Sequence, residues 1–597
     1  MSGRLGKLPR LLAATTAAAA IAAASPARAD DRFALGMFHF NVQYVAGGMV
    51  GYYTTPNPAI DLDAEQIEDA IVTQSFAPVL SLYAKHPTWG VDIELQGYML
   101  DVLAARHPET LALLRTLAKS GQIEVVSFHY SDQLFIAHPR EDWSRSQELT
   151  AATFARHDIP LGKSVFCQEG QAGEIMAREM KDRGYETMVW PKNLWSYQHG
   201  EFDAEPLYHF GDITLIAGAK GVNYQSGATS IQVAWTFFDD GELLATNKMN
   251  PYFPDLFMKN EKALADYEAE VSALEGQGFA ITTVSKYVAA VKDKVPIADP
   301  PPLLDGTWQP GSTDGVHRWL GGGGLWGKDE RDNDMRTLAS LAHRELLAAE
   351  TIAAKVGLDA TATLADAWRL LALGEVSDAT GINPFRGEAE YGIGHLTETL
   401  RIAREVIEDA KAKLGMEKAA IDPASGEVTE GEADAFRGKE TAAPITLVID
   451  GGDRAVTETW EEVQPGLVRV EIGFDNAESR FISVRFPGAM DDEIVTTRAL
   501  DDTVPASYPR SAFTFEHFHL PLPIGMVGLG GGSFLVQDQA RVHLAAQIFR
   551  DSGDVVFADE TATSGETATW VFYVLEGTAE DAVTFARALN ERRALSR

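Results

Sequence analysis

The chain has 597 residues, a formal net charge of −35 at pH 7 and a single cysteine. A surplus of acidic residues this large argues against nucleic acids, anionic membranes and polyanionic substrates as partners, whereas neutral sugars remain compatible. One cysteine excludes an internal disulfide. The length exceeds what one hydrophobic core supports, so several domains are expected.

The first 29 residues are predicted to be a secretory signal peptide. Three basic residues within the first ten positions precede an Ala-rich apolar run from Leu11 to Ala24. The small-residue pattern Ala27-Arg28-Ala29 follows, as at a cleavage site. The apolar run is shorter than the roughly 20 residues that span a bilayer. We therefore expect a periplasmic or secreted protein that starts near Asp30 and is not inserted in the membrane after cleavage.

Residues 30–300 are predicted to form an α/β catalytic domain, a seven-stranded (β/α) barrel. Short β-like runs alternate with helical segments, as in βα units around a parallel sheet. Helices are expected at Tyr98–Lys119 and Glu261–Leu274, where apolar residues recur at helical spacing. Seven expected strands favour a barrel over an open sheet. They are Phe33–Phe40, Val91–Leu95, Ile123–Phe128, Ser164–Cys167, Thr187–Trp190, Ile213–Ala217 and Ile231–Phe238.

Residues 301–416 are predicted to be a helical domain packed against the barrel. A proline-rich break at 296–302 cannot continue a helix and marks the boundary. Long Leu/Ala-rich patterns follow it and are typical of a helical bundle. The expected helices are Arg336–Val356, Thr363–Leu373 and Gly394–Leu414.

The remainder of the chain is predicted to be a linker followed by a β-sandwich. Residues 417–443 are acidic and have little apolar periodicity, which is typical of a linker. Residues 444–597 contain alternating or β-branched runs with turn residues between them, which favours a sandwich. The expected strands are Ile445–Ile449, Leu467–Ile472, Arg480–Arg485, Arg541–Phe549 and Thr569–Leu575.

The first expected strand ends in polar residues that share a face. It reads Phe38-His39-Phe40-Asn41, and side chains of a strand alternate, so His39 and Asn41 point the same way. Hydrogen-bonding groups that converge at a barrel mouth suit a polyhydroxylated ligand. Alternatively, His39 begins a metal site.

Acidic residues and a second histidine also fall at expected strand ends, where α/β barrels carry catalytic groups. The alternative role for each is structural, such as capping the next helix or pairing with a base. Glycoside cleavage needs two carboxyl groups across the scissile bond, and one rim of the barrel supplies several. The candidates are Glu94, His129, Glu169, Asp239 and Asp240.

These motifs resemble glycoside hydrolase family 57, in the neighbourhood of the family 38 α-mannosidases, over about residues 33–410. The resemblance lies in the order of a first-strand His-x-Asn-x-Gln, the segment Ser120–Glu124, a glutamate ending the fourth strand, and a Phe-x-Asp followed by Leu. It implies a retaining hydrolase or transglycosylase acting on an α-glycan. Glu169 would be the nucleophile and Asp240 the acid/base, with His39 and His129 binding or supporting the sugar.

Further residues are expected to bind an oligo- or polysaccharide substrate beside Asn41 and Glu94. Trp190 ends the fifth expected strand, and Trp319 and Trp326 flank a glycine-rich loop; aromatic faces stack on sugar rings. Asp378 lies in a polar break between two helices, similar in position to segments that complete the active site in these families. Tryptophans near long loops also serve as core side chains, and Asp378 has an alternative role as a capping residue.

No metal or other cofactor is expected. Family 38 enzymes hold zinc with a His-x-Asp pair, and Asn41 stands at the carboxylate position, where a neutral amide is a poor zinc ligand. The segment Thr236–Gly241 resembles a motif of polysaccharide deacetylases but lacks the partner His-x-x-x-His. A metal-dependent deacetylase or α-mannosidase-like enzyme and a catalytically silent carbohydrate-binding envelope protein remain the alternatives. The sugar, its linkage and the oligomeric state are left open.

Overall fold

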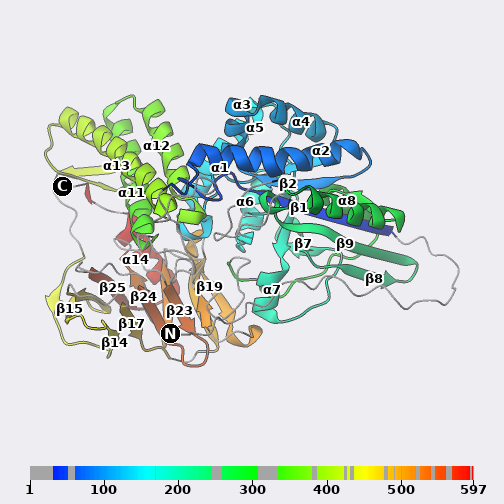
Figure 1. Cartoon of the computed structure of the whole chain (residues 1–597). Coiled ribbons are helices and arrows are strands. Elements are labelled where there is room, and N and C mark those ends of the chain that lie inside the picture. Colours follow the sequence, from blue (N-terminus) through cyan, green and yellow to red (C-terminus); the bar gives the residue numbers. More distant parts are fainter. Residues whose placement is uncertain are drawn as a thin grey trace, which may run out of the picture.

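The computed structural model places an α/β region, a helical domain and two further antiparallel sheets in one chain (Figure 1). The expected signal peptide lies outside the described residues. Among the helices that the structure describes, none has both the length and the hydropathy of a membrane-spanning segment. The described residues are 31–50, 61–167, 170–244, 259–306, 332–379, 386–422, 426–430, 436–475, 482–489, 491–498, 500–514, 517–519, 525–538, 545–559, 568–591 and 594–595.

The first sheet is built around β1 (Asp31–Phe40). Its strand order is β3-β2-β1-β9-β8, and β10 also pairs with β1. β1 is parallel to β2, β9 and β10, and β2 is buried along its whole length, as expected for a strand covered on both faces. The other strands are β2 (Val91–Leu95), β3 (Ile123–Val126), β8 (Val222–Ser226), β9 (Thr229–Asp240) and β10 (Ala280–Thr282).

The second sheet has the order β4-β5-β7-β6. All seven expected strands are therefore present, but they are divided between two sheets, and no closed barrel is recorded within the described ranges. The edges at β3 and β4 lie close together, since the Gly162 amide donates to the Val125 carbonyl at 2.8 Å. The strands are β4 (Ser164–Val165), β5 (Thr187–Pro191), β6 (Tyr208–Phe210) and β7 (Ile213–Gly218).

Helices cover these sheets and differ in one respect from the sequence pattern. The single helix expected at Tyr98–Lys119 is two helices, because Pro108 lacks an N–H and begins a new helix after His107. α8 begins where the Asn260 side chain accepts a hydrogen bond from the Ala263 amide at 3.0 Å. The helices are α1 (Ala64–Ile71), α2 (Ala77–Lys85), α3 (Gly97–Arg106), α4 (Pro108–Lys119), α5 (Arg140–Arg156), α6 (Met176–Asp182), α7 (Lys192–His199), α8 (Glu261–Gly276) and α9 (Val284–Val291).

Three long helices lie in the region where the helical patterns predict them: α11 (Asp332–Val356), α12 (Thr361–Gly374) and α13 (Arg386–Leu414). They share one hydrophobic core. α13 begins earlier than its apolar pattern predicted. A Cβ at Gly392 would lie 2.1 Å from the side chain of Met335, so this glycine allows α13 to approach α11 closely.

The segment 417–443, expected to be a linker, contains three short strands, so that prediction is wrong for the described part. They are β11 (Ala419–Asp422), β12 (Glu427–Glu430) and β13 (Lys439–Glu440). β11 pairs with β12 and with β26 (Ala594–Leu595) near the other end of the chain. The buried side chains of Ala419 and Ile421 supply the apolar contact that a solvated linker lacks.

Two antiparallel sheets follow, in the orders β13-β15-β16-β25-β22-β21-β18-β19 and β14-β17-β24-β23-β20. Their facing side chains share one core, in which the Phe486 and Phe572 rings are 5.0 Å apart. The helix α14 (Ala579–Glu591) packs against the first of them. The strands are β14 (Val448–Asp450), β15 (Val456–Gln464), β16 (Leu467–Phe474), β17 (Ile482–Phe486), β18 (Glu493–Arg498), β19 (Asp501–Pro509), β20 (His517–His519), β21 (Met526–Gly530), β22 (Ser533–Gln537), β23 (Ala545–Phe549), β24 (Val555–Asp559) and β25 (Ala568–Glu576).

Candidate active site

Strand register places His39 between two acidic side chains. In the parallel pairing of β1 with β2, His39 lies opposite Glu94, and in the pairing of β1 with β9 it lies opposite Asp240. His39 Nδ1 forms a short hydrogen bond with Glu94 Oε2, and both side chains are buried. Three of the predicted residues thus meet at the carboxyl ends of adjacent strands, as ligand sites of α/β sheets do.

Asn41 connects this strand end to the helical domain. Its Nδ2 donates to Asp132 and, at 3.1 Å, to Oδ2 of Asp378. Asp378 lies in the short 3-10 helix η5 (Ser377–Ala379), which follows α12. Asn41 and Asp378 were predicted from the sequence, but Asp132 was not, because it lies six residues beyond the end of β3 in a segment without regular periodicity.

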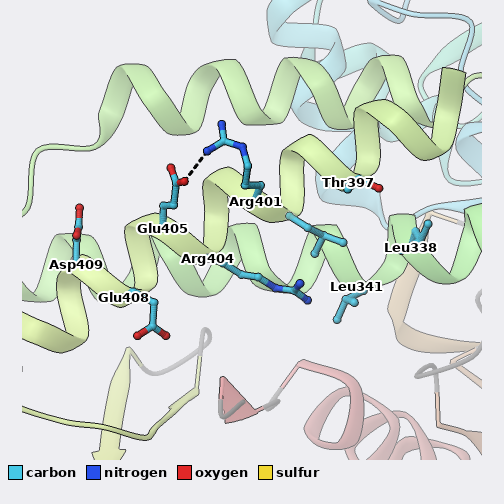
Figure 2. Close-up of a pocket in the computed structure, with 9 residues that line it drawn as sticks. Leu338, Leu341, Thr397, Arg401, Arg404, Glu405, Glu408 and Asp409 are labelled. Carbon is cyan, nitrogen blue, oxygen red and sulfur yellow. Dashed lines mark hydrogen bonds and ion pairs between the residues drawn. The ribbon is translucent and has the colours of Figure 1, made fainter.

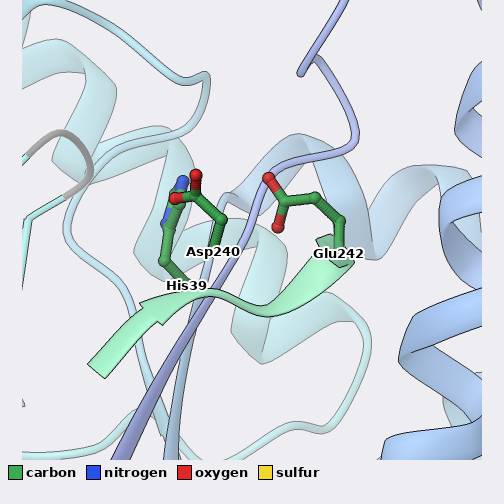
Figure 3. Close-up of side chains that lie close together, drawn as sticks. All are labelled: His39, Asp240 and Glu242. Atoms are coloured by element: carbon green, nitrogen blue, oxygen red, sulfur yellow. The ribbon is translucent and has the colours of Figure 1, made fainter. Parts of the chain in front are cut away.

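Asp240 and Glu242 present two carboxyl groups beside His39 (Figure 3). Asp240 ends β9, and the 3-10 turn η4 (Gly241–Leu243) carries Glu242, which is fully buried. A Cβ at Gly241 would lie 2.6 Å from the Phe40 ring and 2.9 Å from the His39 carbonyl oxygen, so glycine permits the close approach to β1. Glu242 was also missed, although an acidic residue two positions after Asp240 is a sequence signal for it.

Burial and mutual repulsion keep protons on these carboxyl groups. Burial and the neighbouring charge of Asp239 raise the pKa of Asp240 to about 6, although His39 opposes the shift. Burial and the charge of Asp240 raise the pKa of Asp378 to about 8 and that of Glu242 well above its usual value. Asp240 is therefore protonated in mildly acidic solution and able to donate a proton.

The two histidines have opposite charge preferences. Burial disfavours a charge on His39, but the charge and hydrogen bond of Glu94 outweigh it and raise the pKa of His39. Burial and the nearby His39 lower the pKa of His129 to about 3, so His129 is neutral. Within the described part of the chain, neither ring nitrogen of the buried His129 has a hydrogen-bond partner. His129 therefore retains hydrogen-bonding capacity for a neutral hydroxyl.

The remaining predicted site residues are not brought into this cluster. Trp190 ends β5 but is fully buried in a hydrophobic core, where its ring lies 5.7 Å from that of Phe210. The expectation that Trp190 stacks on a sugar is not supported, because the ring is already covered by core side chains. Glu169, Trp319 and Trp326 lie outside the described residues.

Within the described ranges, His39, Asp240 and Glu242 could hold a metal ion, since one potential ligand atom from each lies within 4.8 Å of the others. The His-x-Asp zinc pattern does not fit this chain. The Asn41 Oδ1 already accepts the Gln43 amide at 2.6 Å, and its Nδ2 donates to two carboxylates. Any metal site here would therefore have to use Glu242 rather than residue 41.

A separate groove of about 760 Å³ lies along α11 and α13 (Figure 2). Its charged side chains are engaged with each other and with neighbours: Arg401 pairs with Glu398 and Glu405, and Arg404 pairs with Glu345. None of its lining residues is a predicted site residue. The groove is therefore distinct from the cluster around His39.

Comparisons with known proteins give short sequence matches and a long structural one. No family model matches the chain. It is 31% identical to α-amylase 1 of Dictyoglomus thermophilum over 68 residues, which are 11% of this chain and 10% of the amylase. It is 26% identical to the 4-α-glucanotransferase of Thermococcus litoralis over 116 residues, 19% of this chain and 18% of that protein. These alignments thus span less than a fifth of either relative.

The fold matches an α-mannosidase from Enterococcus faecalis V583, with a TM-score of 0.58 and 9% identity over 95% of this chain and 90% of that one. At such low identity the match establishes the fold alone. The fold also matches a protein in glycosyl hydrolase family 38 from Enterococcus faecalis, with a TM-score of 0.54 and 9% identity over 94% of this chain and 88% of that one. The sequence matches to an α-amylase and a 4-α-glucanotransferase and the two fold matches agree with the resemblance to glycoside hydrolases.

Proposed function

We propose that the protein is an exported glycoside hydrolase or transglycosylase that acts on an α-glycan with retention of configuration. Asp240 is the acid/base and Glu169 the nucleophile. The observation that carries the proposal is the placement of Asp240 at the end of β9, beside His39 and with its pKa raised to about 6. A catalytic acid needs a raised pKa, and it must then return as a base in the second step.

The proposed reaction proceeds in two displacements. Asp240 donates its proton to the glycosidic oxygen while the Glu169 carboxylate attacks the anomeric carbon and the leaving group departs. The ionised Asp240 then takes a proton from water, or from a sugar hydroxyl in a transfer reaction, which attacks the glycosyl-enzyme and frees Glu169. This route requires the two carboxyl groups to lie about 5 to 5.5 Å apart.

The other polar groups of the cluster bind and orient the sugar. His39, held by Glu94, offers a charged donor, and Asn41 and Asp378 form a bonded pair at the same strand end. The neutral His129 supplies a ring donor and acceptor. We also assign sugar stacking to Trp319 and Trp326.

The α-glycan class comes from the relatives, which are named as an α-amylase and a 4-α-glucanotransferase. Export comes from the basic, Ala-rich and small-residue pattern of residues 1–29. The net charge of −35 agrees with an uncharged substrate, because a polyanionic glycan would be repelled.

Turnover of an α-linked glucan or maltooligosaccharide should give products that retain the α configuration. Proton NMR of the anomeric signals, recorded before mutarotation, measures this directly. A β product would contradict the double displacement. Binding of the same glycans without turnover would favour a silent carbohydrate-binding protein. Loss of activity in a chelator and recovery with a divalent metal would favour the metal-dependent alternative at His39, Asp240 and Glu242.

The Asp239→Asn protein should be as active as the native protein in acid. As the pH is raised, its activity should begin to fall at a lower pH than that of the native protein. The exposed Asp239 raises the pKa of Asp240 by repulsion, so its neutralisation lowers that pKa, by about half a unit to one unit for an adjacent charge. The alkaline limb of the pH profile of kcat/KM reports the pKa of the catalytic acid in the free enzyme, so it should move by the same amount. An unchanged limb would show that another group sets it.

A further inference from the structure

The strand β9 carries one extra residue where it pairs with β1. Leu35 pairs with Trp235, but Gly36, the next residue of β1, pairs with Phe237. Thr236 therefore has no partner position on β1, which is the arrangement of a β-bulge. Bulges are rare between parallel strands, and they occur beside active sites, where they redirect a side chain.

The packing of the β9 side chains shows the same shift. In a regular strand, residues two positions apart share a face. Trp235 and Phe238, which are three positions apart, pack against the same core, with their ring centroids 5.3 Å apart. Phe237 instead stacks on Phe38 at 4.3 Å in a different core. The bulge thus reverses the faces of the residues that follow it.

This reversal determines which of two adjacent aspartates lies beside His39. Asp240 pairs with His39, and Asp239 pairs with Phe38. Side chains alternate along both strands, so Asp240 lies on the His39 face and the exposed Asp239 lies on the opposite face. Regular pairing beyond Leu35 would place Asp239 opposite His39, because a slip of one residue moves every side chain to the other face.

A chain of hydroxyl groups holds the bulge in place. The buried Thr236 hydroxyl donates to the Leu35 carbonyl at 3.1 Å, at the point where the register shifts. The Tyr267 hydroxyl, on α8, donates to Thr236 Oγ1 at 3.3 Å and lies 2.7 Å from the Tyr83 hydroxyl, on α2. Each hydroxyl has one proton, so Tyr83 is the donor to Tyr267. The bulge is therefore tied to two helices.

Gly36 leaves the space that the bulge occupies. A Cβ on Gly36 would lie 2.7 Å from Thr236 Oγ1 and 3.1 Å from a methyl group of Val91. Gly36 does not have a positive φ, so its backbone conformation is open to other residues. Glycine is required here for space, and a larger residue would push Thr236 out of the bulge.

We propose that this bulge selects Asp240 rather than Asp239 as the carboxyl group of the active site. Gly36, Thr236 and Tyr267 are its positioning residues. The bulge absorbs one residue of β9, so that Asp240 reaches the strand end on the face of the site. The role of Asp240 in turnover rests on the proposed function, whereas the effect of the bulge on the direction of the two side chains does not.

Cysteines introduced at the two aspartate positions report which side chain faces the site, without any need for turnover. Cys167 is buried and is the one cysteine of the sequence, so iodoacetamide reads Asp239→Cys or Asp240→Cys alone. In the otherwise native chain, Asp239→Cys should react about tenfold faster, because Asp239 is exposed and Asp240 is confined beside His39. Mass spectrometry of the labelled peptide measures both rates.

Gly36→Ala should reverse this order of labelling, since its Cβ displaces Thr236 and regular pairing turns Asp239 toward the site. Deletion of Thr236 from the Gly36→Ala chain should restore the native order. The extra residue is then gone, and Asp240 keeps its place in regular pairing. Gly276→Ala, on α8, is the matched control and should keep the native rates, because a Cβ there has open space within the described part of the chain.

Turnover gives the part of the test that depends on the proposed function. Gly36→Ala should lower kcat for an α-glucan by about 10²-fold, because a displaced catalytic group loses its alignment with the substrate. Deletion of Thr236 in the same chain should recover kcat to within about threefold of native. A native chain that turns over no glycan but shows the expected labelling would refute the proposed function while supporting the role of the bulge.

If Gly36→Ala does not fold, Thr236→Val and Thr236→Ser decide the question. Valine has the shape of threonine without the hydroxyl, so it should lower the ratio of the two labelling rates by about fivefold, the factor given by one hydrogen bond of ordinary strength. Serine keeps the hydroxyl and should keep the native ratio. A native ratio in Thr236→Val, or in a folded Gly36→Ala protein, would overturn selection by the bulge.

Discussion

Replacement of Glu169 by glutamine should reduce kcat for an α-glucan by about 10³-fold or more, because loss of a covalent nucleophile removes the main route through the transition state. An amide does not form the glycosyl ester that the double displacement requires. The thermal unfolding midpoint should stay within a few degrees of native, since glutamine has nearly the same shape. Steady-state rates and an unfolding curve measure both. Retained turnover would exclude Glu169 as the nucleophile.

The product that the Glu169→Ala protein forms with azide distinguishes a nucleophile from an acid/base at this position. Azide can enter the space that the carboxylate leaves, attack the anomeric carbon and displace the leaving group, which takes its proton from Asp240. One inversion replaces two, so the product of an α-glycoside should be a β-glycosyl azide. Glu186→Gln, which changes an exposed glutamate paired with Lys163 at the start of the next strand, is the control and should retain native kcat. An α-glycosyl azide from Glu169→Ala would instead assign this residue to the acid/base role.

The parts of the site that were predictable from the sequence follow from strand periodicity. β2 has the predicted bounds, and β1 and β9 extend the predicted runs by a few residues. Because parallel strands end at one edge, the strand-end residues His39, Glu94 and Asp240 meet there. Local pattern was sufficient for this part of the cluster.

The contacts that join these residues across the chain depend on long-range docking and could not be predicted. Asn41 and Asp378 are 337 positions apart, and Gln133 and Glu375 are 242 apart, so no local period links them. The site is completed only when the helical domain packs against the α/β region. The division of the expected strands into two sheets, with β3 and β4 at the edges, is likewise not specified by strand periodicity.

Trp190 shows that a position at a strand end does not by itself predict a place in the site. Its place at a strand end gave no information on which side of the sheet its ring would lie. The structure places the ring among the buried side chains of a core rather than at the mouth. A strand-end position therefore identifies a polar candidate more securely than an aromatic one, because a buried tryptophan gains stability from packing whereas a buried carboxyl requires partners.

Replacement of Asp240 by asparagine should lower kcat for an α-glucan by about 10² to 10⁴-fold, the range expected when a general acid is removed. An asparagine does not protonate the glycosidic oxygen, so the loss falls on substrates with a poor leaving group. An aryl α-glycoside with a strongly acidic phenol needs no such proton and should form the glycosyl-enzyme at close to the native rate. Pre-steady-state release of the phenol measures that step separately from kcat.

The pH profile gives the independent check on Asp240. A raised pKa of about 6 means that the native acid is protonated below that pH and loses its proton as the pH rises through it. In the native protein, kcat/KM should therefore decrease as the pH rises through about 6. This alkaline limb of the pH profile should disappear in Asp240→Asn. The adjacent Asp239→Asn protein, which keeps the acid and only shifts its pKa, should retain the limb. Persistence of the native limb in Asp240→Asn would transfer the acid role to Asp378 or Glu242, the other carboxyl groups of the cluster with a raised pKa.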